Sequence, residues 1–356
     1  MKIFTVIGAR PQFIKAAVVS RALAEHRPDV REILVHTGQH YDANMSDVFF
    51  DELNIPRPDH NLGVGGGTHG QNTGRMIEKL EALMLAENPD WVLVYGDTDS
   101  TLAGALAAAK LHIPVAHVEA GLRSFNRRMP EEINRVLTDH VAALLFAPTE
   151  LARTNLRKEG IAEEKIHVVG DVMYDAALFY KERARKPDWF EALGIALNEF
   201  VLCTIHRADN TDDQERMQGI LEGLEGAGLP VILPLHPRTR NKLQQMNLQL
   251  PANINVVDPV GYLEMVWLEA NCKLVATDSG GVQKEAYFHQ KPCVTLRDET
   301  EWVELVDEGF NQLVRADAGL IAKALLESST SDFSKLLYGD GRSAIGLVKK
   351  LDLLSK

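Results

Sequence analysis

One stretch of the chain, residues 117–135, concentrates side chains that could exchange protons with a ligand or hold its charge. It carries three carboxylates and four arginines in nineteen residues. The apolar run 113–118 predicts a buried strand, and Pro130 suits the first position of a helix. Glu119 then lies at the carboxyl end of a strand, and Glu131 lies near the amino end of a helix. Because ligands bind at strand carboxyl ends in open parallel sheets, both acids are candidate site residues.

Each of these two acids also has a structural explanation. Glu131 can complement the helix dipole and pair with Arg135 one turn later, which for an isolated helix is the commoner role. A structural role explains Glu119 less well, because an acid directly after an apolar strand is poorly suited to a core. The helix itself is predicted from an apolar stripe formed by Ile133, Val136, Leu137, Val141 and Leu144.

A third acid, Asp97, follows another apolar strand at residues 91–95. A helix of small residues from Ser100 to Lys110 leads from this strand to the one before Glu119. Such a strand-helix-strand unit places Asp97 and Glu119 at the same edge of a parallel sheet. The structural alternative for Asp97 is the N-cap of the following helix.

Two cations accompany the first predicted strand, residues 3–7, and the helix predicted at residues 12–25. Arg10 lies in the turn between them, and Lys15 lies one turn into the helix. A helix amino end flanked by these cations could hold an anion. An ordinary strand-turn-helix with solvated cations explains the same residues equally well.

The second half of the chain repeats the pattern of an apolar strand followed by polar residues. The predicted strands 200–205 and 231–235 end at His206 and His236, and the strand 274–277 leads to Ser279, Gly280 and Gly281. The last three residues open a helix that contains Glu285. Exposed N–H groups at such a helix start suit a phosphate. Glu285 could hold ribose hydroxyls, which suggests a nucleotide sugar.

A glycine-rich stretch, residues 63–74, is interpreted as a mobile loop over a cleft. It follows no clear strand and lacks the GxGxxG order, so it is no dinucleotide fingerprint. The cysteines Cys203, Cys272 and Cys293 show no metal-type spacing and are expected to be buried thiols. We therefore expect no cofactor and no metal, with activity that survives EDTA and needs no added NAD.

The length and net charge of the chain further limit its possible fold class and binding partners. The chain has 356 residues, 45% hydrophobic, with a net charge of −12, which disfavours nucleic acid and anionic membranes as partners. No secretory signal or membrane span is expected. The alternation of strands and helices predicts an α/β protein with two doubly wound parallel sheets. The expected domains are 1–170 and 171–340.

Seven motifs in order resemble the non-hydrolysing UDP-N-acetylglucosamine 2-epimerases. They lie at residues 8–15 (GARPQFIK), 95–104 (YGDTDSTLAG), 117–124 (HVEAGLRS), 129–135 (MPEEINR), 206–210 (HRADN), 236–240 (HPRTR) and 277–286 (TDSGGVQKEA). The resemblance implies two Rossmann-like domains facing across a cleft, a B-type glycosyltransferase-like fold. It also implies a C-terminal helix, residues 341–356, that packs back on the first domain.

The resemblance implies inversion at C2 of a UDP-linked 2-acetamido sugar, by anti elimination of UDP to a glycal and re-addition. Asp97, Glu119 and Glu131 would do acid–base work, and His206 would lie near the departing phosphate. The predicted UDP-sugar ligands are Arg10, Lys15, Arg135, His236, Ser279, Gly280, Gly281 and Glu285. We expect a cytoplasmic homodimer that makes precursors of surface polysaccharide, and UDP-N-acetylglucosamine ranks first as substrate because most of the family uses it.

Two departures from the family pattern bear on regulation and substrate. Residues 39–42 (Gln-His-Tyr-Asp, with Met45 later) and Ala208-Asp209 differ from the segment tied to activation by a second substrate molecule. Residues 301–304 (Glu-Trp-Val-Glu) resemble the branch acting on UDP-2,3-diacetamido-2,3-dideoxy-glucuronate. Two interpretations of Trp302 stay open: its side chain contacts the sugar, or it is a buried residue without a role in binding. A uronate would need an arginine, and the candidates are Arg123, Arg127 and Arg128.

Three other functions compete with this interpretation. A glycosyltransferase of the same fold would need an acceptor site. A hydrolysing epimerase would release free sugar. A nucleotide-sugar sensor would not require three acids. Incubation with a UDP-sugar and no acceptor distinguishes them.

Overall fold

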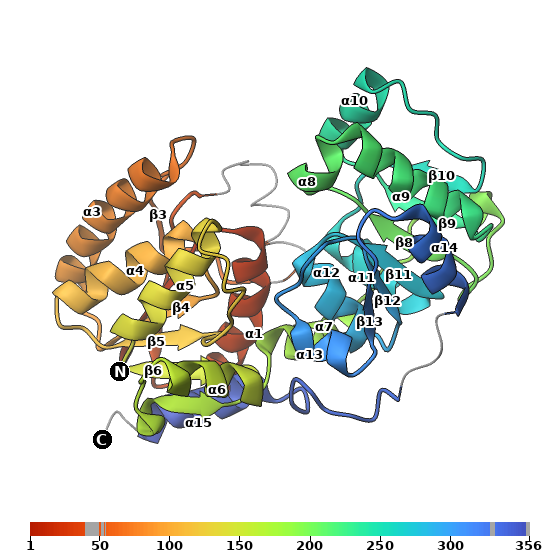
Figure 1. The fold of residues 1–356 in the computed structure, drawn as a ribbon. Coiled ribbons are helices and arrows are strands. Elements are labelled where there is room, and N and C mark those ends of the chain that lie inside the picture. Colours follow the sequence, from red (N-terminus) through yellow and green to blue (C-terminus); the bar gives the residue numbers. More distant parts are fainter. Residues whose placement is uncertain (40–49, 51–52, 54, 328–331, 354–356) are drawn as a thin grey trace. The chain divides into compact units, whose positions relative to one another are not determined.

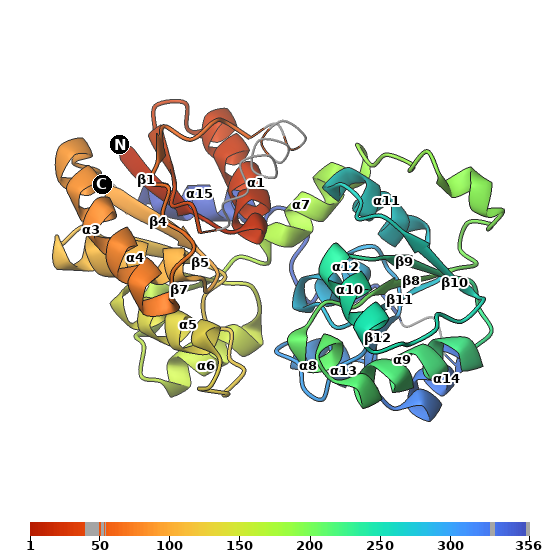
Figure 2. The same cartoon turned by 90° about the horizontal axis from the view of Figure 1, so that it is seen from above.

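The computed structural model describes residues 1–39, 50, 53, 55–327 and 332–353. The chain divides into two compact units, Met1–Ala176 with Leu336–Lys356, and Ala177–Lys335 (Figures 1 and 2). They are called unit 1 and unit 2 below. The domain boundaries expected at residues 170 and 340, and the expected cleft, stay predictions.

Unit 1 is built on a parallel sheet whose strand order is β3-β2-β1-β4-β5-β6-β7 among the described residues. Its strands are β1 (Lys2–Ile7), β2 (Arg31–His36), β3 (His60–Asn61), β4 (Trp91–Tyr95), β5 (Val115–Val118), β6 (Leu144–Ala147) and β7 (Ile166–Val168). Its helices are α1 (Arg10–His26), α3 (His69–Glu87), α4 (Asp99–Lys110), α5 (Pro130–Val141), α6 (Glu150–Lys158) and α15 (Ser343–Leu353). A 3₁₀ turn, η1 (Glu163–Lys165), precedes β7, and α7 (Val172–Lys181) passes into unit 2.

The helices of unit 1 cover its sheet in two groups. Helices α3, α4 and α5 lie side by side, and α15 packs against α1 (Figures 1 and 2). Alternate strand residues such as Phe4 and Val6 of β1 and Val92 and Val94 of β4 join one buried core with α3 and α4. Their strand neighbours, such as Leu93, are buried too. Burial on both faces explains the unbroken apolar runs in these strands.

Unit 2 contains a second parallel sheet, with the order β10-β9-β8-β11-β12-β13 in the part that the structure describes. Its strands are β8 (Val201–Thr204), β9 (Val231–Pro234), β10 (Ile254–Val257), β11 (Leu274–Thr277), β12 (Cys293–Thr295) and β13 (Asn311–Leu313). Its helices are η2 (Phe190–Leu193), α8 (Ala208–Thr211), α9 (Gln214–Gly226), α10 (Pro237–Gln245), α11 (Tyr262–Asn271), α12 (Gly280–Phe288), α13 (Val303–Asp307) and α14 (Ala318–Glu327).

The two faces of the second sheet bury separate cores. Val201 and Cys203 of β8 join one core with α9 and α14, whereas Leu202 joins the other core with α11. This period of two is what a strand buried on both faces requires. Cys203, Cys272 and Cys293 are buried thiols, as expected.

In both sheets the strand order reverses at one point, between β1 and β4 in unit 1 and between β8 and β11 in unit 2. Open α/β sheets bind ligands at such switch points, outside the carboxyl ends of the strands. Arg10 begins α1 directly after the β1 loop, Asp97 lies in the loop after β4, and His206 and Ser279 lie in the loops after β8 and β11. The predicted site residues therefore cluster where these folds bind ligands.

The structure corrects one local expectation and rules out one alternative. The stretch 63–74 is not all loop, because α3 begins at His69, where Thr68 caps the helix by accepting from Gln71 N. Asp97 is not the N-cap of α4, because the hydroxyl of Thr98 accepts from Thr101 N instead. Helix α3 and strands β3 and β13 were not predicted. The two strands are only two and three residues long, whereas Met76, Leu80 and Met84 of α3 have a helical spacing.

The predicted apolar stripe of α5 is only partly buried: Val136 and Val141 are half-buried, and Leu144 belongs to β6 rather than to the helix. Ile133 and Leu137 are 40% and 44% exposed, whereas the buried residues of α5 are Glu132, Asn134, Arg135, Thr138 and Asp139. The helix therefore turns a polar face toward the rest of unit 1. That face supplies partners for residues at the ends of β4 and β5.

Gly121, in the loop after β5, should tolerate no side chain. Its φ is +84°, and a Cβ would lie 2.5 Å from the carbonyl oxygen of Ala152. Gly160 has the same conformation, with φ +83° and nothing within 4 Å of a Cβ. We expect Gly121→Ala to cost about 3 kcal/mol, from backbone strain plus a steric clash, and Gly160→Ala about 1 kcal/mol from strain alone.

Thermal unfolding of the two variants checks this difference, since both substitutions lie in unit 1. A Tm loss for Gly121→Ala no larger than for Gly160→Ala would contradict the close approach of the loop to α6.

Candidate active site

The carboxyl ends of β1, β4 and β5 meet at one edge of the first sheet. β1 pairs with β4, and β4 pairs with β5, all in parallel register. Gly8 follows β1 and approaches the hydroxyls of Thr37 and Ser100 too closely to carry a Cβ. The turn after β1 therefore packs directly on the hydroxyls of Thr37, after β2, and Ser100, in the first turn of α4.

Glu119 adopts a left-handed backbone conformation, with φ +72°. This conformation is costly for a residue with a side chain and persists only where its surroundings enforce it. The N–H groups of Glu119 and Ala120 both donate to the carbonyl of Phe146, at 3.1 Å each. The Glu119 carboxylate forms an ion pair with Lys15, and both side chains are only 8% exposed. The Lys15 ammonium thus neutralises the Glu119 carboxylate, which is largely buried.

Asp97 interacts electrostatically with the other acids and cations of this candidate site. Its carboxylate lies 2.5 Å from Arg135 Nη2, and its carbonyl accepts from Asn134 Nδ2 at 2.9 Å. Burial raises the pKa of Asp97, the charges of Glu119 and Glu131 raise it further, and those of Arg135 and Lys15 oppose the rise. The side chain still keeps 31% of its surface exposed, so a ligand can reach it.

The structure brings most of the first predicted group together. Asp97, Glu119 and Glu131 act on one another electrostatically, and Lys15 and Arg135 neutralise two of them. Glu131 lies in the first turn of α5 and is exposed to solvent. Arg10 is the first residue of α1 and is partly exposed. Three acids and two buried cations at a switch point can exchange protons with a bound substrate.

A buried network behind these acids was not predicted. His117 lies in β5 and places Nδ1 2.7 Å from Asp139 Oδ1 and Nε2 2.7 Å from the carbonyl of Gly96. Both side chains are fully buried. Since a carbonyl and a carboxylate both accept, the contacts suit an imidazolium that donates through both nitrogens. The network ties the loop of Asp97 to the strand that ends at Glu119.

Arg123 completes this network and is not free for a substrate. Its guanidinium is 1% exposed and pairs with Asp139 and Glu159, at 2.7 Å each. Burial alone would raise the pKa of Asp139, but the charges and hydrogen bonds of His117 and Arg123 hold it below its usual range. Arg123 as a ligand for a uronate is therefore wrong. Arg127 and Arg128 are exposed.

Gln12 joins the first and fourth strands and was also missed as a site-building residue. Its Oε1 accepts from Gly8 N and Ala9 N, at 2.8 and 2.9 Å. Its Nε2 donates to the carbonyl of Tyr95 at 2.8 Å and to the hydroxyl of Thr101 at 2.9 Å. The side chain thus fixes the turn that precedes Arg10. Its presence within the first family motif was the available signal.

His206 and Asp278 form the corresponding centre of unit 2. The Asp278 carboxylate is fully buried and accepts from the backbone N–H groups of His206 and Arg207, at 3.1 Å. It also accepts from Asn210 Nδ2 at 3.1 Å and lies 3.2 Å from His206 Nδ1. The His206 side chain is 55% exposed. A buried acid therefore fixes the loop after β8 while the imidazole stays open to a ligand.

The Ser279 turn opens helix α12 as predicted. The Ser279 hydroxyl accepts from Val282 N, and Gly280 and Gly281 occupy the first helical positions. A Cβ on Gly280 would clash with the Glu301 carboxylate, whereas a Cβ on Gly281 would only make van der Waals contact with Ser279 Oγ, at 3.9 Å. Exposed N–H groups and the helix dipole make this turn suitable for a phosphate.

Trp302 is buried against this turn, so the structural alternative for it holds. Its indole N–H donates to the carbonyl of Gly280 at 2.8 Å, and the Lys284 ammonium lies 4.1 Å from the ring centroid. Lys284 is itself 2% exposed, and Glu285 next to it is partly exposed on the same helix. The branch-specific segment 301–304 therefore supports the predicted phosphate site.

His236 caps helix α10. Its Nδ1 accepts from Arg238 N at 3.2 Å, and the residue is exposed at the carboxyl end of β9. β9 pairs with β8, so His236 and His206 follow neighbouring strands. The cap leaves Nε2 available to a ligand.

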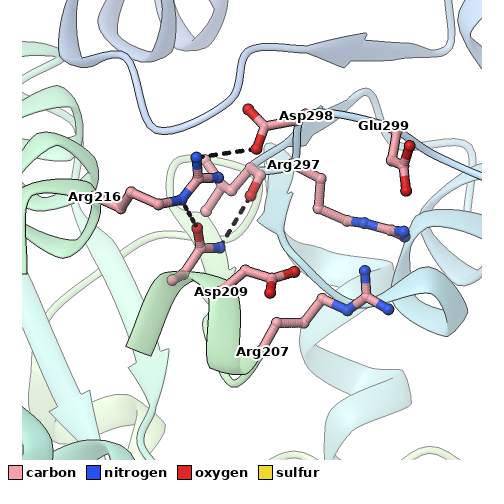
Figure 3. A pocket seen from close by; sticks show the side chains of 8 residues that line it. Arg207, Asp209, Arg216, Arg297, Asp298 and Glu299 are labelled. Atoms are coloured by element: carbon pink, nitrogen blue, oxygen red, sulfur yellow. Dashed lines mark hydrogen bonds and ion pairs between the residues drawn. The ribbon is translucent and has the colours of Figure 1, made fainter. Parts of the chain in front are cut away.

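A cavity of about 120 Å³ lies at the carboxyl ends of β8 and β12 (Figure 3). It is lined by Arg207, Asp209, Asn210, Arg216, Leu296, Arg297, Asp298 and Glu299. Arg216 is held by Asn210 and Asp298, at 3.1 and 3.0 Å, and Arg297 pairs with Glu301 at 2.8 Å. The cavity extends the polar surface beside His206. Its lining has three guanidinium groups and three carboxylates, so it carries no excess of positive charge for an anion.

Within residues 1–39, 50, 53, 55–327 and 332–353, no cluster of His, Cys, Asp and Glu has the geometry of a metal site. Among the same residues no helix is both long and apolar enough to cross a membrane. His40, Tyr41, Asp42 and Met45, which differ from the family's activation segment, lie outside the described residues.

Comparison with known proteins identifies this combination of sheets and motifs. The family model for UDP-N-acetylglucosamine 2-epimerase matches residues 21–352. The chain is 56% identical to UDP-2,3-diacetamido-2,3-dideoxy-D-glucuronate 2-epimerase of Pseudomonas aeruginosa, over 96% of this chain and 95% of the relative. It is 50% identical to a UDP-N-acetylglucosamine 2-epimerase homolog of Methanococcus maripaludis, over 99% of both chains.

A solved structure agrees with these relatives. The UDP-GlcNAc 2-epimerase of Methanocaldococcus jannaschii, in complex with UDP-GlcNAc and UDP, superposes with a TM-score of 0.88 at 45% identity. The match covers 99% of this chain and 100% of that chain. The expected fold class, two Rossmann-like parallel-sheet domains of the B-type glycosyltransferase-like kind, is confirmed.

Asp278→Asn should both destabilise unit 2 and displace His206. An amide would turn an N–H₂ group toward backbone donors that now share a buried carboxylate, at a cost of about 2 kcal/mol. We expect a lower Tm and weaker UDP binding by calorimetry. Asp298→Asn is the matched control, since that acid pairs with Arg216 while 57% exposed. Its effect should stay within about 0.5 kcal/mol. Equal effects of the two substitutions would rule out the organising role of Asp278.

Proposed function

Because the chain belongs to the UDP-N-acetylglucosamine 2-epimerase family, we propose that it inverts C2 of a UDP-linked 2-acetamido sugar. The observation that carries this proposal is the grouping of Asp97, Glu119 and Glu131 at the switch point of the first sheet. Inversion of a carbon centre without a hydride acceptor requires that a proton leave one face and another arrive on the opposite face. That chemistry requires more than one acid–base group.

The reaction divides into elimination and re-addition. A carboxylate takes the C2 proton, the C2–H electron pair forms the C1=C2 bond, and UDP leaves C1 with the electrons of the C1–O bond. In the reverse step UDP adds back to C1, and C2 receives a proton on its other face. The net reaction is redox-neutral. Cations and helix N–H groups around the diphosphate stabilise the charge that develops on UDP.

The surroundings of Glu119 and Asp97 support different roles for the two residues, one as base and one as acid. Glu119 is paired with Lys15, which favours its ionised form, the form that can accept a proton. Asp97 has a raised pKa, mainly through burial, so it more readily carries a proton. Asp97 also pairs with a cation, Arg135, but burial outweighs that pairing and raises its pKa. A raised pKa in one of two neighbouring carboxyl groups is a usual basis of acid and base assignments. We propose Glu119 as the base and Asp97 as the acid in one direction, with their roles exchanged in the other.

Unit 2 would hold the nucleotide. The start of α12 at Ser279, Gly280 and Gly281 suits the diphosphate. His206 is exposed beside it, and a cation there would assist departure of the phosphate. Glu285 on the same helix would accept from the ribose hydroxyls, and His236 adds a donor at the neighbouring strand end.

For the sugar, we propose the 2,3-diacetamido uronate ahead of UDP-N-acetylglucosamine. Two observations support this order: the 56% identity to the Pseudomonas aeruginosa uronate enzyme, and Trp302 of the branch-specific segment packed on the Gly280 turn. This reverses the ranking from family breadth alone. Arg127 and Arg128 are the remaining arginine candidates for the uronate carboxylate.

We further propose a cytoplasmic homodimer that supplies sugar precursors for surface polysaccharide, a proposal that rests on family membership. The exposed Ile133 and Leu137, one turn apart on α5, support a contact between copies of this chain. Their exposure is otherwise unexplained on a helix whose buried side is polar.

The test is incubation with each UDP-sugar in D2O, with EDTA present and without acceptor or NAD. We expect both C2 epimers to form with deuterium at C2, and kcat/KM to favour the uronate by at least tenfold, or about 1.4 kcal/mol. Release of free sugar would indicate a hydrolysing enzyme. No turnover without an acceptor would indicate a glycosyltransferase, and binding without turnover would indicate a sensor. A preference for UDP-N-acetylglucosamine would overturn only the choice of sugar.

Glu119→Gln and Glu285→Ala should separate chemistry from nucleotide binding. Glu119→Gln should lower kcat by about 10²–10⁴-fold with the UDP affinity nearly unchanged, because it removes one proton-transfer group. Glu285→Ala should mainly weaken UDP binding, because it removes a ribose acceptor. Calorimetry with UDP and steady-state kinetics measure the two effects. Parallel losses of affinity and turnover in both variants would argue against this division.

A further inference from the structure

A histidine in the glycine-rich stretch 63–74 contacts the start of helix α4. His69 is the first residue of α3, and α3 lies beside α4 (Figures 1 and 2). Its Nδ1 lies 2.9 Å from Oδ2 of Asp99, the first residue of α4. The Asp99 side chain is 5% exposed, whereas that of His69 is 66% exposed. Since an ionised carboxylate only accepts, His69 donates through Nδ1 and links a buried acid to the surface.

The second oxygen of Asp99 contacts Asn134 of α5. Asn134 Nδ2 lies 3.3 Å from Asp99 Oδ1 and 2.9 Å from the carbonyl oxygen of Asp97. Both oxygens are acceptors, so the nitrogen end of the amide must face them. Asn134 is buried, with 6% of its surface exposed. A chain of hydrogen bonds therefore runs from the surface at His69 to the backbone of Asp97.

Three successive carbonyl groups at the end of β4 and in its loop accept hydrogen bonds from side chains of other elements. The donor and acceptor pairs are Gln12 Nε2 with Tyr95 at 2.8 Å, His117 Nε2 with Gly96 at 2.7 Å and Asn134 Nδ2 with Asp97 at 2.9 Å. Backbone acceptors at a strand end need partners that the sheet does not supply, so such donors decide where the loop lies. Asn134 is the donor that holds Asp97 itself.

We propose that His69 is a positioning residue that holds the loop of Asp97 in place for proton transfer. It acts through the buried Asp99 carboxylate and the amide of Asn134. This inference rests on the proposed acid–base role of Asp97. The stretch 63–74 thereby contributes to turnover, although none of its residues is a proposed acid, base or nucleotide ligand.

Loss of the His69 contact would loosen this chain of hydrogen bonds. A buried carboxylate that loses a donor is costly, so Asp99 would turn toward water and away from Asn134. The Asp97 carbonyl would then lose its fixed donor, while Arg135 still pairs with the Asp97 carboxylate at 2.5 Å. A small displacement of a reacting group can lower a rate about 10²-fold. Unit 2 is proposed to hold the nucleotide, so UDP affinity should change little.

The experiment measures kcat with each UDP-sugar, UDP affinity by calorimetry, Tm, and amide hydrogen exchange of residues 96–101, all on the full chain. His69→Ala should lower kcat about tenfold and speed exchange of this segment, with UDP affinity and Tm near those of the wild type. His69→Asn places an amide N–H close to the position of Nδ1, so it should recover most of both losses. His26→Ala, which replaces an exposed histidine at the end of α1, is the matched control and should change none of these quantities.

A double variant tests whether the two side chains act together. Asn134→Ala should lower kcat at least as much as His69→Ala, because it removes the donor to Asp97 directly. If both act through one chain of hydrogen bonds, the double variant should lose no more than Asn134→Ala alone. Independent losses that multiply would overturn the inference. Should Asn134→Ala not fold, the two His69 variants decide.

The outcomes separate this inference from the function on which it rests. If Asp97→Asn abolishes turnover while His69→Ala changes neither kcat nor the exchange of residues 96–101, the positioning role is wrong and the acid–base role of Asp97 stands. If Asp97→Asn leaves turnover unchanged, both roles fail. Failure of His69→Asn to recover kcat would mean that the ring itself meets the substrate, which overturns the positioning role. If neither sugar turns over, the exchange rates decide: unchanged exchange in His69→Ala overturns the role, and faster exchange supports it.

Discussion

The contact between His117 and Asp139 is the interaction on which the first candidate site depends. It joins β5 to α5 inside the protein, and the second ring nitrogen of His117 reaches the carbonyl of Gly96. The His117 imidazole thereby holds both the loop of Asp97 and the end of the strand that precedes Glu119. A buried charged network of this kind is stable only when each member is satisfied, and removal of one partner would cost about 3–5 kcal/mol. Glu119, which follows this strand in a left-handed conformation, is held by its N–H bond to the carbonyl of Phe146 and by its ion pair with Lys15.

A buried aspartate also holds a strand-end loop at the switch point of unit 2. The buried Asp278 gathers the backbone N–H groups after β8 and leaves the imidazole of His206 exposed. In both units a buried aspartate therefore holds a strand-end loop, while a different side chain faces a ligand. The physical reason is common to both, because loops at strand ends have backbone donors that the sheet does not satisfy. A carboxylate accepts several of them at once.

The start of helix α12 is covered by a segment that differs from the commoner family motif. The segment after β12 covers the Gly280 turn through Glu301 and Trp302, and Lys284 packs on the tryptophan ring. A substitution in this segment would therefore change the packing of the helix start, because Trp302 donates to the carbonyl of Gly280.

The sequence by itself determined the two parallel sheets, most strand positions and the residues at strand ends, because buried strands are continuous apolar runs and site loops interrupt them with polar motifs. It missed β3 and β13, which have two and three residues, and it assigned the start of α3 to a loop because glycines there resemble a turn. Only the tertiary structure decided the partners: Arg135 with Asp97, Arg123 with Asp139, and His206 with Asp278. Periodicity tells which residues share a face of one element, whereas the partner of a buried charge depends on which element packs there.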